Sequence, residues 1–187
     1  MSMSTDASTN AERFIVVTGG PGSGKSTLIS RLRAAGYPGT DEAGRGVIRD
    51  QTAIGGSAVP WVDAALFAEA MLSWEMRSYR LAAAETGPVF FDRGLPDIVG
   101  YLNLVGHPVP AHVSTAAHRL RYRTRVFVAP PWPEIYVGDD ERRQSFAEAK
   151  RTWAQMVETY TDYGYEPIEL PRASVEERVR FVLEALL

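Results

Sequence analysis

One short segment constrains this sequence more than any other, the run GGPGSGKS from Gly19 to Ser26. It matches the pattern G-x-x-x-x-G-K-[S/T], whose glycines let backbone N–H groups curl inward around phosphate oxygens. An apolar, β-branched run precedes it at residues 13–18, and a stretch with apolar residues at helical spacing follows it as far as Gly36. A buried strand therefore leads into the loop and a helix leads out, as in an α/β nucleotide-binding domain.

The loop also predicts how a nucleotide is held. The helix that starts near Gly24 adds its positive dipole end, Lys25 reaches the β- and γ-phosphates, and Ser26 offers its hydroxyl to Mg²⁺. The predicted nucleotide-binding residues are Gly20, Gly22, Ser23, Gly24, Lys25, Ser26 and Thr27. We expect ATP and Mg²⁺ as cofactors. The alternative is a glycine-rich turn with no ligand, which four glycines followed by Lys-Ser disfavour.

Short apolar strands alternate with helices along the rest of the chain. Further strands are expected at 37–42, 89–92, 125–128 and 167–170, and helices at 43–53, 63–85, 95–105, 111–120, 140–163 and 174–186. This alternation predicts a five-stranded parallel sheet with helices on both faces, in one domain over residues 13–187. Ligands of such sheets bind beyond the carboxyl ends of the strands.

Composition excludes several classes of protein. The 187 residues contain no cysteine, which rules out disulfides, thiolate metal sites and a cysteine nucleophile. The formal charge of −3 provides no basic field to attract nucleic acid, so a nucleic-acid partner is not expected. No apolar run approaches the length of a membrane span. Residues 1–12 are polar and lack the pattern of a signal peptide, so we expect a disordered tail on a cytoplasmic protein.

An acid at the end of the strand 89–92 is the first candidate beside the loop. Asp92 is expected to complete the Mg²⁺ shell with Ser26, and the alternative is that it caps the following helix. The next residue, Arg93, either binds a phosphate or pairs with a carboxylate. Asp97 shows no pattern that assigns it a role and is expected at the surface.

A second acidic segment, Thr40-Asp41-Glu42, follows the expected strand at 37–42 and lies on the same rim as the loop. Glu42 is the candidate acid that takes the proton of an attacking hydroxyl, and Arg45 is placed to hold substrate or phosphate. The alternative is a helix N-terminus, with Thr40 or Asp41 as its cap. The two interpretations are compatible.

A candidate lid segment lies at the start of the long helix expected at 140–163. Asp139 or Asp140 is predicted to cap this helix, and Arg142 and Arg143 follow in its first turn. Cations there oppose the positive helix end, so phosphate oxygens are the natural partners of both arginines. Pairing of these arginines with Glu141 and Asp139 is the alternative. Arginine-bearing lids close over the transferring phosphoryl group in small phosphotransferases.

Three weaker features favour structural roles. Arginine alternates with other residues at 119, 121, 123 and 125, which is typical of a solvated face or a helix end. The three histidines show no metal-ligand spacing. Trp132 follows a Pro-Pro pair and either packs in a turn or stacks on a base.

Taken together, GGPGSGKS, the stretch Glu42–Arg45, FFDRGLPD and PPWPEIYxxDxxR resemble the NadR-type P-loop domain family over about residues 13–187. The resemblance implies a kinase-like fold with strand order 2-3-1-4-5. More distantly, the chain is similar to deoxynucleoside and thymidylate kinases, in which an acid after the second strand acts as base. Glu42 and the Asp92-Arg93 pair match those positions, whereas Asp41 stands where that pattern has proline.

Two functions follow as hypotheses. The first is a kinase that moves the γ-phosphoryl group of Mg·ATP to a small nucleoside- or nucleotide-like acceptor. The second is a regulatory or switch enzyme that hydrolyses ATP or GTP without such an acceptor. The sequence contains no N-K-x-D or LSGGQ signature, which argues against a Ras-like protein and a transporter ATPase. The predicted catalytic set is Lys25, Glu42, Asp92, Arg93, Arg142 and Arg143.

Overall fold

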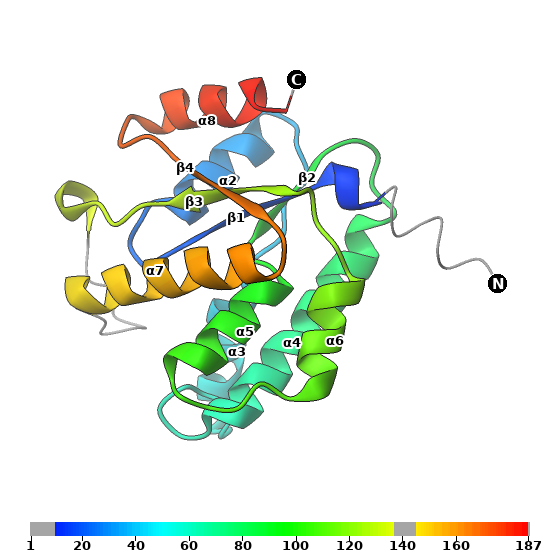
Figure 1. Cartoon of the computed structure of the whole chain (residues 1–187), viewed down its shortest axis with the longest axis vertical. Coiled ribbons are helices and arrows are strands. Elements are labelled where there is room, and N and C mark those ends of the chain that lie inside the picture. Colours follow the sequence, from blue (N-terminus) through cyan, green and yellow to red (C-terminus); the bar gives the residue numbers. More distant parts are fainter. Residues whose placement is uncertain (1–9, 137–144, 187) are drawn as a thin grey trace.

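The computed structural model describes residues 10–136 and 145–186, which form a parallel sheet covered by helices (Figure 1). The strands are β1 (Phe14–Gly19), β2 (Val89–Asp92), β3 (Arg125–Ala129) and β4 (Glu166–Glu169), hydrogen-bonded in the order β2-β1-β3-β4. Val17 of β1 lies opposite Asp92 of β2 and Phe127 of β3. The carboxyl ends of the three strands therefore meet at one edge of the sheet.

Seven α-helices are described. They are α2 (Lys25–Ala34), α3 (Ala43–Ile54), α4 (Ala64–Ala82), α5 (Leu95–Leu104), α6 (Ala111–Arg119), α7 (Phe146–Asp162) and α8 (Val175–Glu184), with a short 3-10 helix, η1 (Pro133–Ile135). Residues 10–13 form one further helical turn before β1, and the first nine residues of the expected tail lie outside the described part.

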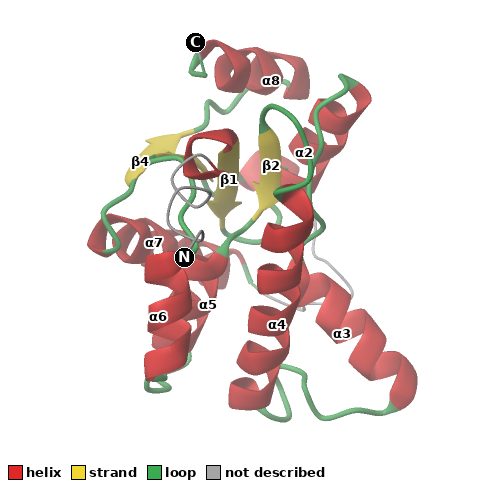
Figure 2. Cartoon of the chain, turned by 90° about the vertical axis from the view of Figure 1, so that its right-hand side faces the viewer, coloured by secondary structure: helices red, strands yellow, loops and turns green. Residues whose placement is uncertain are grey.

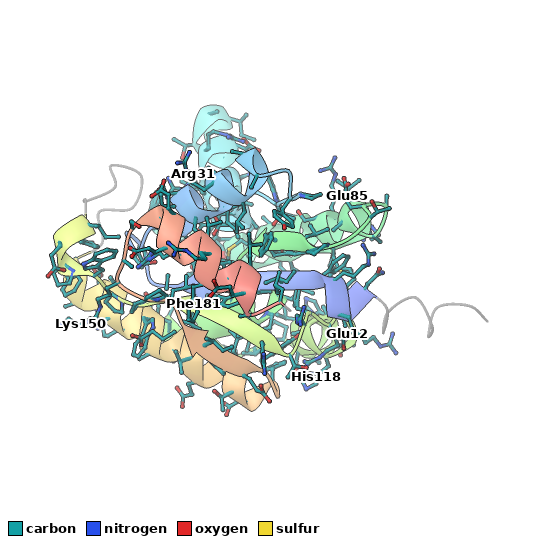
Figure 3. All side chains as sticks on the ribbon, turned by 90° about the horizontal axis from the view of Figure 1, so that it is seen from above. Glu12, Arg31, Glu85, His118, Lys150 and Phe181 are labelled. Carbon is teal, nitrogen blue, oxygen red and sulfur yellow. The ribbon has the colours of Figure 1, made fainter. Side chains whose placement is uncertain are left out.

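Alternation along the strands divides the core into two layers. Phe14 and Val16 of β1 face one core, and Ile15 and Val17 face the other, because successive side chains of a strand point to opposite faces. Helices α2 and α8 cover the second face, and Arg31 of α2 pairs with Glu176 of α8 at 2.6 Å (Figures 1 and 3). Helices α3 to α7 cover the first face, and α3 to α6 extend away from the sheet (Figure 2).

The prediction of a fifth strand at 37–42 is wrong. The described segment makes one isolated parallel bridge, Gly39 to Phe90, with Thr40 N donating to Phe90 O and Phe90 N donating to the carbonyl of Pro38. The sheet thus has four strands within the described residues, and the bridge lies on the outer side of β2, where the expected order puts the missing strand. Pro38 has no N–H to donate and Gly39 has no side chain to pack, so a ladder does not extend.

The long helix begins later than predicted. Helix α7 starts at Phe146, and Ser145 and Glu148 form a reciprocal capping box in which the Ser145 side chain accepts from the Glu148 N–H. The prediction that Asp139 or Asp140 caps this helix is therefore wrong. Arg142 and Arg143 precede α7 in sequence and lie outside the described residues.

The weaker sequence features have structural partners. The Arg121 guanidinium lies 3.9 Å from the ring centre of Tyr165, Arg123 donates to the carbonyl of Leu186, and Arg125 approaches Glu166. His112 pairs with Glu69, and the described residues contain no cluster of metal-ligating side chains. None of the described helices is long and apolar enough to cross a membrane.

Candidate functional site

The phosphate loop connects β1 to α2 and has the curled backbone that its glycines predict. Gly22 and Gly24 adopt φ of 67° and 81°, the left-handed region that glycine enters without a steric penalty. A Cβ on Gly20 would lie 2.4 Å from the carbonyl oxygen of Ala149 in α7. Lys25 Nζ is buried and donates to the carbonyl of Gly20 at 2.6 Å. The loop is thus wound around its own lysine and packed against α7.

An arginine that sequence reasoning missed holds the loop from behind. Arg178 of α8 is only 2% exposed, and it donates to the carbonyls of Ser23, at 2.8 Å, and of Pro171. Its guanidinium also lies 4.9 Å from the ring centre of Trp132, which is half-buried. The hydrogen bond between Arg178 and Ser23 joins residues that are 155 positions apart in sequence, so no local pattern predicts it.

Ser26 and Asp92 lie together, as a shared cation requires. The Ser26 hydroxyl donates to Oδ2 of Asp92 at 3.1 Å. Oδ1 of Asp92 is buried and has no hydrogen-bond partner within the described part of the chain. Burial, followed by the Glu42 carboxylate, raises the pKa of Asp92, which the charges of Lys25 and Arg93 partly oppose. A hydroxyl beside a buried carboxylate oxygen without a partner fits Mg²⁺, which prefers oxygen ligands.

Glu42 and Arg93 form a buried ion pair at the same edge of the sheet. Arg93 Nε lies 3.0 Å from Oε1 of Glu42, and Arg93 Nη1 lies 2.9 Å from Oδ1 of Asp97. Although burial disfavours its charge, the carboxylates of Glu42, Asp97 and Asp92 hold the pKa of Arg93 above its ordinary value. Of the two roles predicted for Arg93, the structure shows the carboxylate pairing.

Asp97 is buried, so the expectation of a surface position is wrong. Its carboxylate accepts from the hydroxyls of Thr18 and Tyr160, from the backbone N–H of Gly94 and from Arg93. The reason is local, since Arg93 has a φ of +72° and turns the chain so that the first turn of α5 lies over the end of β1. A non-glycine residue held in this conformation is typical of a functional site.

The alternative in which Thr40 or Asp41 caps the following helix does not hold. Glu42 occupies the N-cap position of α3 without a side-chain cap bond, which leaves its carboxylate for Arg93. The Thr40 hydroxyl accepts from the backbone N–H of Asp92, and Asp41 pairs with Arg33 at the surface. Arg45 approaches the second oxygen of Glu42, at 3.7 Å.

A cavity of about 700 Å³ opens beside the phosphate loop. Pro21, Glu42 and Arg93 line it where it meets the loop. Its remaining wall is mostly apolar and aromatic and comes from α3, α4, α5, α7 and the segment before α4; it includes Ile48, Pro60, Trp61, Phe67, Met71, Ile98, Tyr101, Leu104 and Met156. Apolar walls with a few polar groups at one end are typical of small-molecule sites. No local sequence pattern predicts this cavity, because its wall residues come from segments that are far apart in sequence.

One acid of this wall, Glu75 of α4, also escaped sequence reasoning. Its side chain is 2% exposed. Burial, and then the carboxylates of Asp97, Asp92 and Glu42, raise the pKa of Glu75 well above its ordinary value. In the sequence, Glu75 is one polar residue among the apolar positions of a helix. Only its burial in the structure distinguishes it from an exposed helical glutamate.

Comparison with known proteins agrees with the fold. A family model described as an AAA domain matches residues 14–178. Among solved structures, a NadR protein in complex with NR superimposes with a TM-score of 0.66 at 18% identity, covering 93% of this chain and 50% of that one. The chain therefore spans about half of that NadR chain. Among curated sequences the comparison finds no match.

Two kinase structures match over nearly their whole lengths. A thymidylate kinase from Ehrlichia chaffeensis has a TM-score of 0.63 at 14% identity, covering 93% of this chain and 98% of that chain. A deoxyadenosine kinase from M. mycoides with products dCMP and dCDP has a TM-score of 0.59 at 15% identity, covering 92% and 98%. At such identities the likeness shows the fold, an α/β P-loop kinase-like fold with a parallel sheet.

Proposed function

The chain belongs to the AAA domain family, and on that premise we propose that it is an ATP-dependent kinase. It transfers the γ-phosphoryl group of Mg·ATP to a small nucleoside- or nucleotide-like acceptor. The observation that carries this proposal is the 700 Å³ cavity, which meets the phosphate loop at Pro21 and has Glu42 and Arg93 at the same end. An enzyme that only hydrolyses a nucleotide needs room for one water molecule, not a cavity of this size.

The proposed reaction assigns a role to each group at that end. Glu42 accepts the proton of the acceptor hydroxyl, the hydroxyl oxygen forms a bond to the γ-phosphorus, and the bond from that phosphorus to the bridging oxygen breaks to release ADP. Arg93, fixed between Glu42 and Asp97, holds the Glu42 carboxylate in position. Exclusion of water by the apolar wall favours the acceptor hydroxyl as the nucleophile.

The nucleotide is proposed to bind on the loop. Backbone N–H groups of residues 22–27, at the loop and the start of α2, surround the phosphates, and Lys25 exchanges the Gly20 carbonyl for phosphate oxygens. Ser26 and Asp92 would hold Mg²⁺, which neutralises phosphate charge when it is bound. The assignment of Arg142 and Arg143 to the transferring phosphoryl group stays a prediction of the sequence.

The fold supports the choice of acceptor. The solved structures that match include a deoxyadenosine kinase, a thymidylate kinase and a NadR protein in complex with NR. Each of these names points to a nucleoside or nucleotide, and the aromatic groups Trp61, Phe67 and Tyr101 in the cavity wall suit a flat ring. We therefore propose a nucleoside-like acceptor in this cavity.

A panel of nucleosides and nucleoside monophosphates tests the proposal. Purified protein is incubated with Mg·ATP and each compound, ADP release is measured, and the phosphorylated product is identified by mass spectrometry. We expect at least one compound to raise ADP release far above the rate without acceptor and to gain one phosphoryl group. Steady ADP release that no compound accelerates, with phosphate as the only product, would instead establish the hydrolysing switch.

A further inference from the structure

The strongest unexplained feature of the molecule is the carboxyl group of Glu75 in the wall of the cavity. It stands on α4, about midway along the helix, and is 2% exposed. Its Oε2 has no hydrogen-bond partner within residues 10–136 and 145–186. Buried polar atoms without partners are rare in native proteins and call for an explanation, because each loses its hydration without compensation.

Tyr101 of α5 adds a second, independent observation. It lines the same cavity, and its hydroxyl is likewise buried without a hydrogen-bond partner among the described residues. Its ring packs edge-on against Phe67, with the ring centres 5.3 Å apart, which fixes the ring. Two residues that line one cavity therefore each carry a buried polar atom without a partner among the described residues.

A purely structural role explains Glu75 poorly. The cavity wall beside it includes Phe67, Met71, Ile98 and Met156, so a leucine or methionine at position 75 would pack without an unpaired polar atom. The carboxyl group forms no ion pair with the described cations, although Arg93 lies near enough to act on it electrostatically. What remains is recognition of something that enters the cavity.

The charges around Glu75 affect its protonation state, and the protonation state determines which hydrogen bonds it offers to a ligand. Burial and the carboxylates of Asp97, Asp92 and Glu42 raise its pKa, Arg93 opposes them, and the neutral Tyr122 hydroxyl lies within electrostatic reach. The raised pKa favours the neutral carboxylic acid form of Glu75 over the carboxylate. Such a group offers one O–H donor beside one carbonyl acceptor. This is the complement of a ring edge that carries an adjacent acceptor and donor.

We propose that Glu75 is the residue that reads the base of the acceptor, forming paired hydrogen bonds with an uncharged heterocycle that presents a neighbouring donor and acceptor on one edge. The ring nitrogen or carbonyl accepts from the Glu75 hydroxyl, and an N–H of the ring or its amino group donates to the Glu75 carbonyl. Glu42 lines the same cavity beside the loop, so a base held at Glu75 directs the sugar hydroxyl towards Glu42. This inference rests on the proposed kinase function.

Binding measurements without ATP test the inference apart from phosphoryl transfer. Calorimetry compares adenosine with purine riboside, which lacks the amino donor, and cytidine with pyrimidin-2-one riboside, which lacks it in the same way. We expect the wild type to prefer the amino-bearing member of at least one pair. Glu75→Leu should bind that nucleoside at least about tenfold more weakly and lose the preference, since the site no longer pairs with the edge.

Glu75→Gln is the decisive variant. Its amide keeps a donor beside an acceptor, so the affinity should stay within about threefold of the wild type. Glu69→Gln, which changes an exposed acid on the same helix, is the matched control and should change neither affinity nor preference. Mg·ATP affinity should be the same in all four proteins, which also verifies that Glu75→Leu is folded.

The outcomes separate this inference from the proposed function. If the wild type phosphorylates a nucleoside whose affinity and KM are unchanged in Glu75→Leu, the role of Glu75 is overturned and the kinase stands. If Glu75→Gln loses binding as fully as Glu75→Leu, the site uses a carboxylate for a cationic ring, and the uncharged edge is overturned. If the wild type binds Mg·ATP but neither binds nor phosphorylates any nucleoside or nucleoside monophosphate, both proposals fail.

Discussion

The phosphate loop and the cavity beside it differ in whether their buried polar groups have hydrogen-bond partners. In the loop, Lys25 bonds to the Gly20 carbonyl, the Ser23 hydroxyl donates to the same carbonyl, and Arg178 donates to the Ser23 carbonyl. In the cavity, the Glu75 carboxyl and the Tyr101 hydroxyl lack partners among the described residues. The loop carbonyls are thus paired with side chains of the loop and of α8, whereas these two side-chain atoms of the cavity residues have no partner among the described residues.

This difference teaches how the two halves of the site are specified. Backbone N–H groups bind any triphosphate, so the loop defines a class of ligand through glycine conformations alone. Side chains distinguish one small molecule from another, because a buried polar group rejects a ligand that leaves it unpaired. Selectivity should therefore change with variants in the cavity, and nucleotide binding with variants in the loop.

Lys25→Ala should have the largest effect. The variant loses the cation that meets the β- and γ-phosphates, so tight Mg·ATP binding should disappear and turnover should fall by about 10³-fold or more. Calorimetry with Mg·ATP measures the first effect and ADP release the second. Nucleoside binding to the cavity should be preserved. An unchanged Mg·ATP affinity would contradict the assignment of the phosphate loop.

Asp92→Asn should come next. It retains size but loses the charge that pairs with Mg²⁺, so turnover should fall by about 10²- to 10³-fold and the Mg²⁺ concentration for half-maximal rate should rise. Because burial raises the pKa of Asp92, removing the charge should leave the melting temperature equal to or above that of the wild type. Normal turnover in a variant that melts early would identify Asp92 as a structural residue.

Glu42→Gln should lower the rate without weakening nucleotide binding. The amide cannot accept the acceptor's proton, and loss of a positioned base lowers kcat by about 10²- to 10⁴-fold. Glu42 belongs to the cavity end of the site, so Mg·ATP affinity should change little. Measuring kcat and the Mg·ATP dissociation constant on the same preparation separates the two. A variant with full kcat would exclude Glu42 as the base.

Glu75→Gln should produce the smallest effect, on stability and its dependence on pH. The pKa of Glu75 is raised in the folded protein above its ordinary value of about 4.5, so between these pKa values the unfolded chain holds fewer protons. The stability of the wild type thus falls as the pH rises above about 4.5, until the folded pKa is passed. The variant, which has no charge to lose, escapes this penalty.

Thermal unfolding at several pH values measures the difference between Glu75→Gln and the wild type. We expect the variant to melt a few degrees higher at neutral pH, at about 2 to 4 °C for each kcal/mol, with the difference vanishing below about pH 4.5. Glu69→Gln provides the baseline for an exposed acid. A difference that is constant with pH would show that the pKa of Glu75 is the same in the folded and unfolded protein, and would contradict the raised pKa.

Local signals predicted much of the fold and part of the site. The loop at residues 19–26 and the acid at the end of an apolar strand are local patterns, and parallel strands bring Ser26 and Asp92 together. The fifth strand failed because the alternation of strands and helices favoured a strand at 37–42, whereas Pro38 and Gly39 limit the pairing of this segment to one bridge. The start of the long helix failed because Asp139 and Asp140 are good caps in sequence, whereas Ser145 and Glu148 form the capping box of α7.

The amino-acid sequence by itself determined the α/β class, the phosphate loop and the acids at the strand ends, since each depends on residues adjacent along the chain. Only the tertiary structure decided the environments of Asp97, Arg178 and Glu75. All three are charged residues of helices. Asp97 and Arg178 form hydrogen bonds with residues far away in sequence, and Oε2 of Glu75 is buried without a partner among the described residues. Burial and long-range pairing arise when helices pack on the sheet. The periodicity of residues along a single helix therefore predicts neither of them.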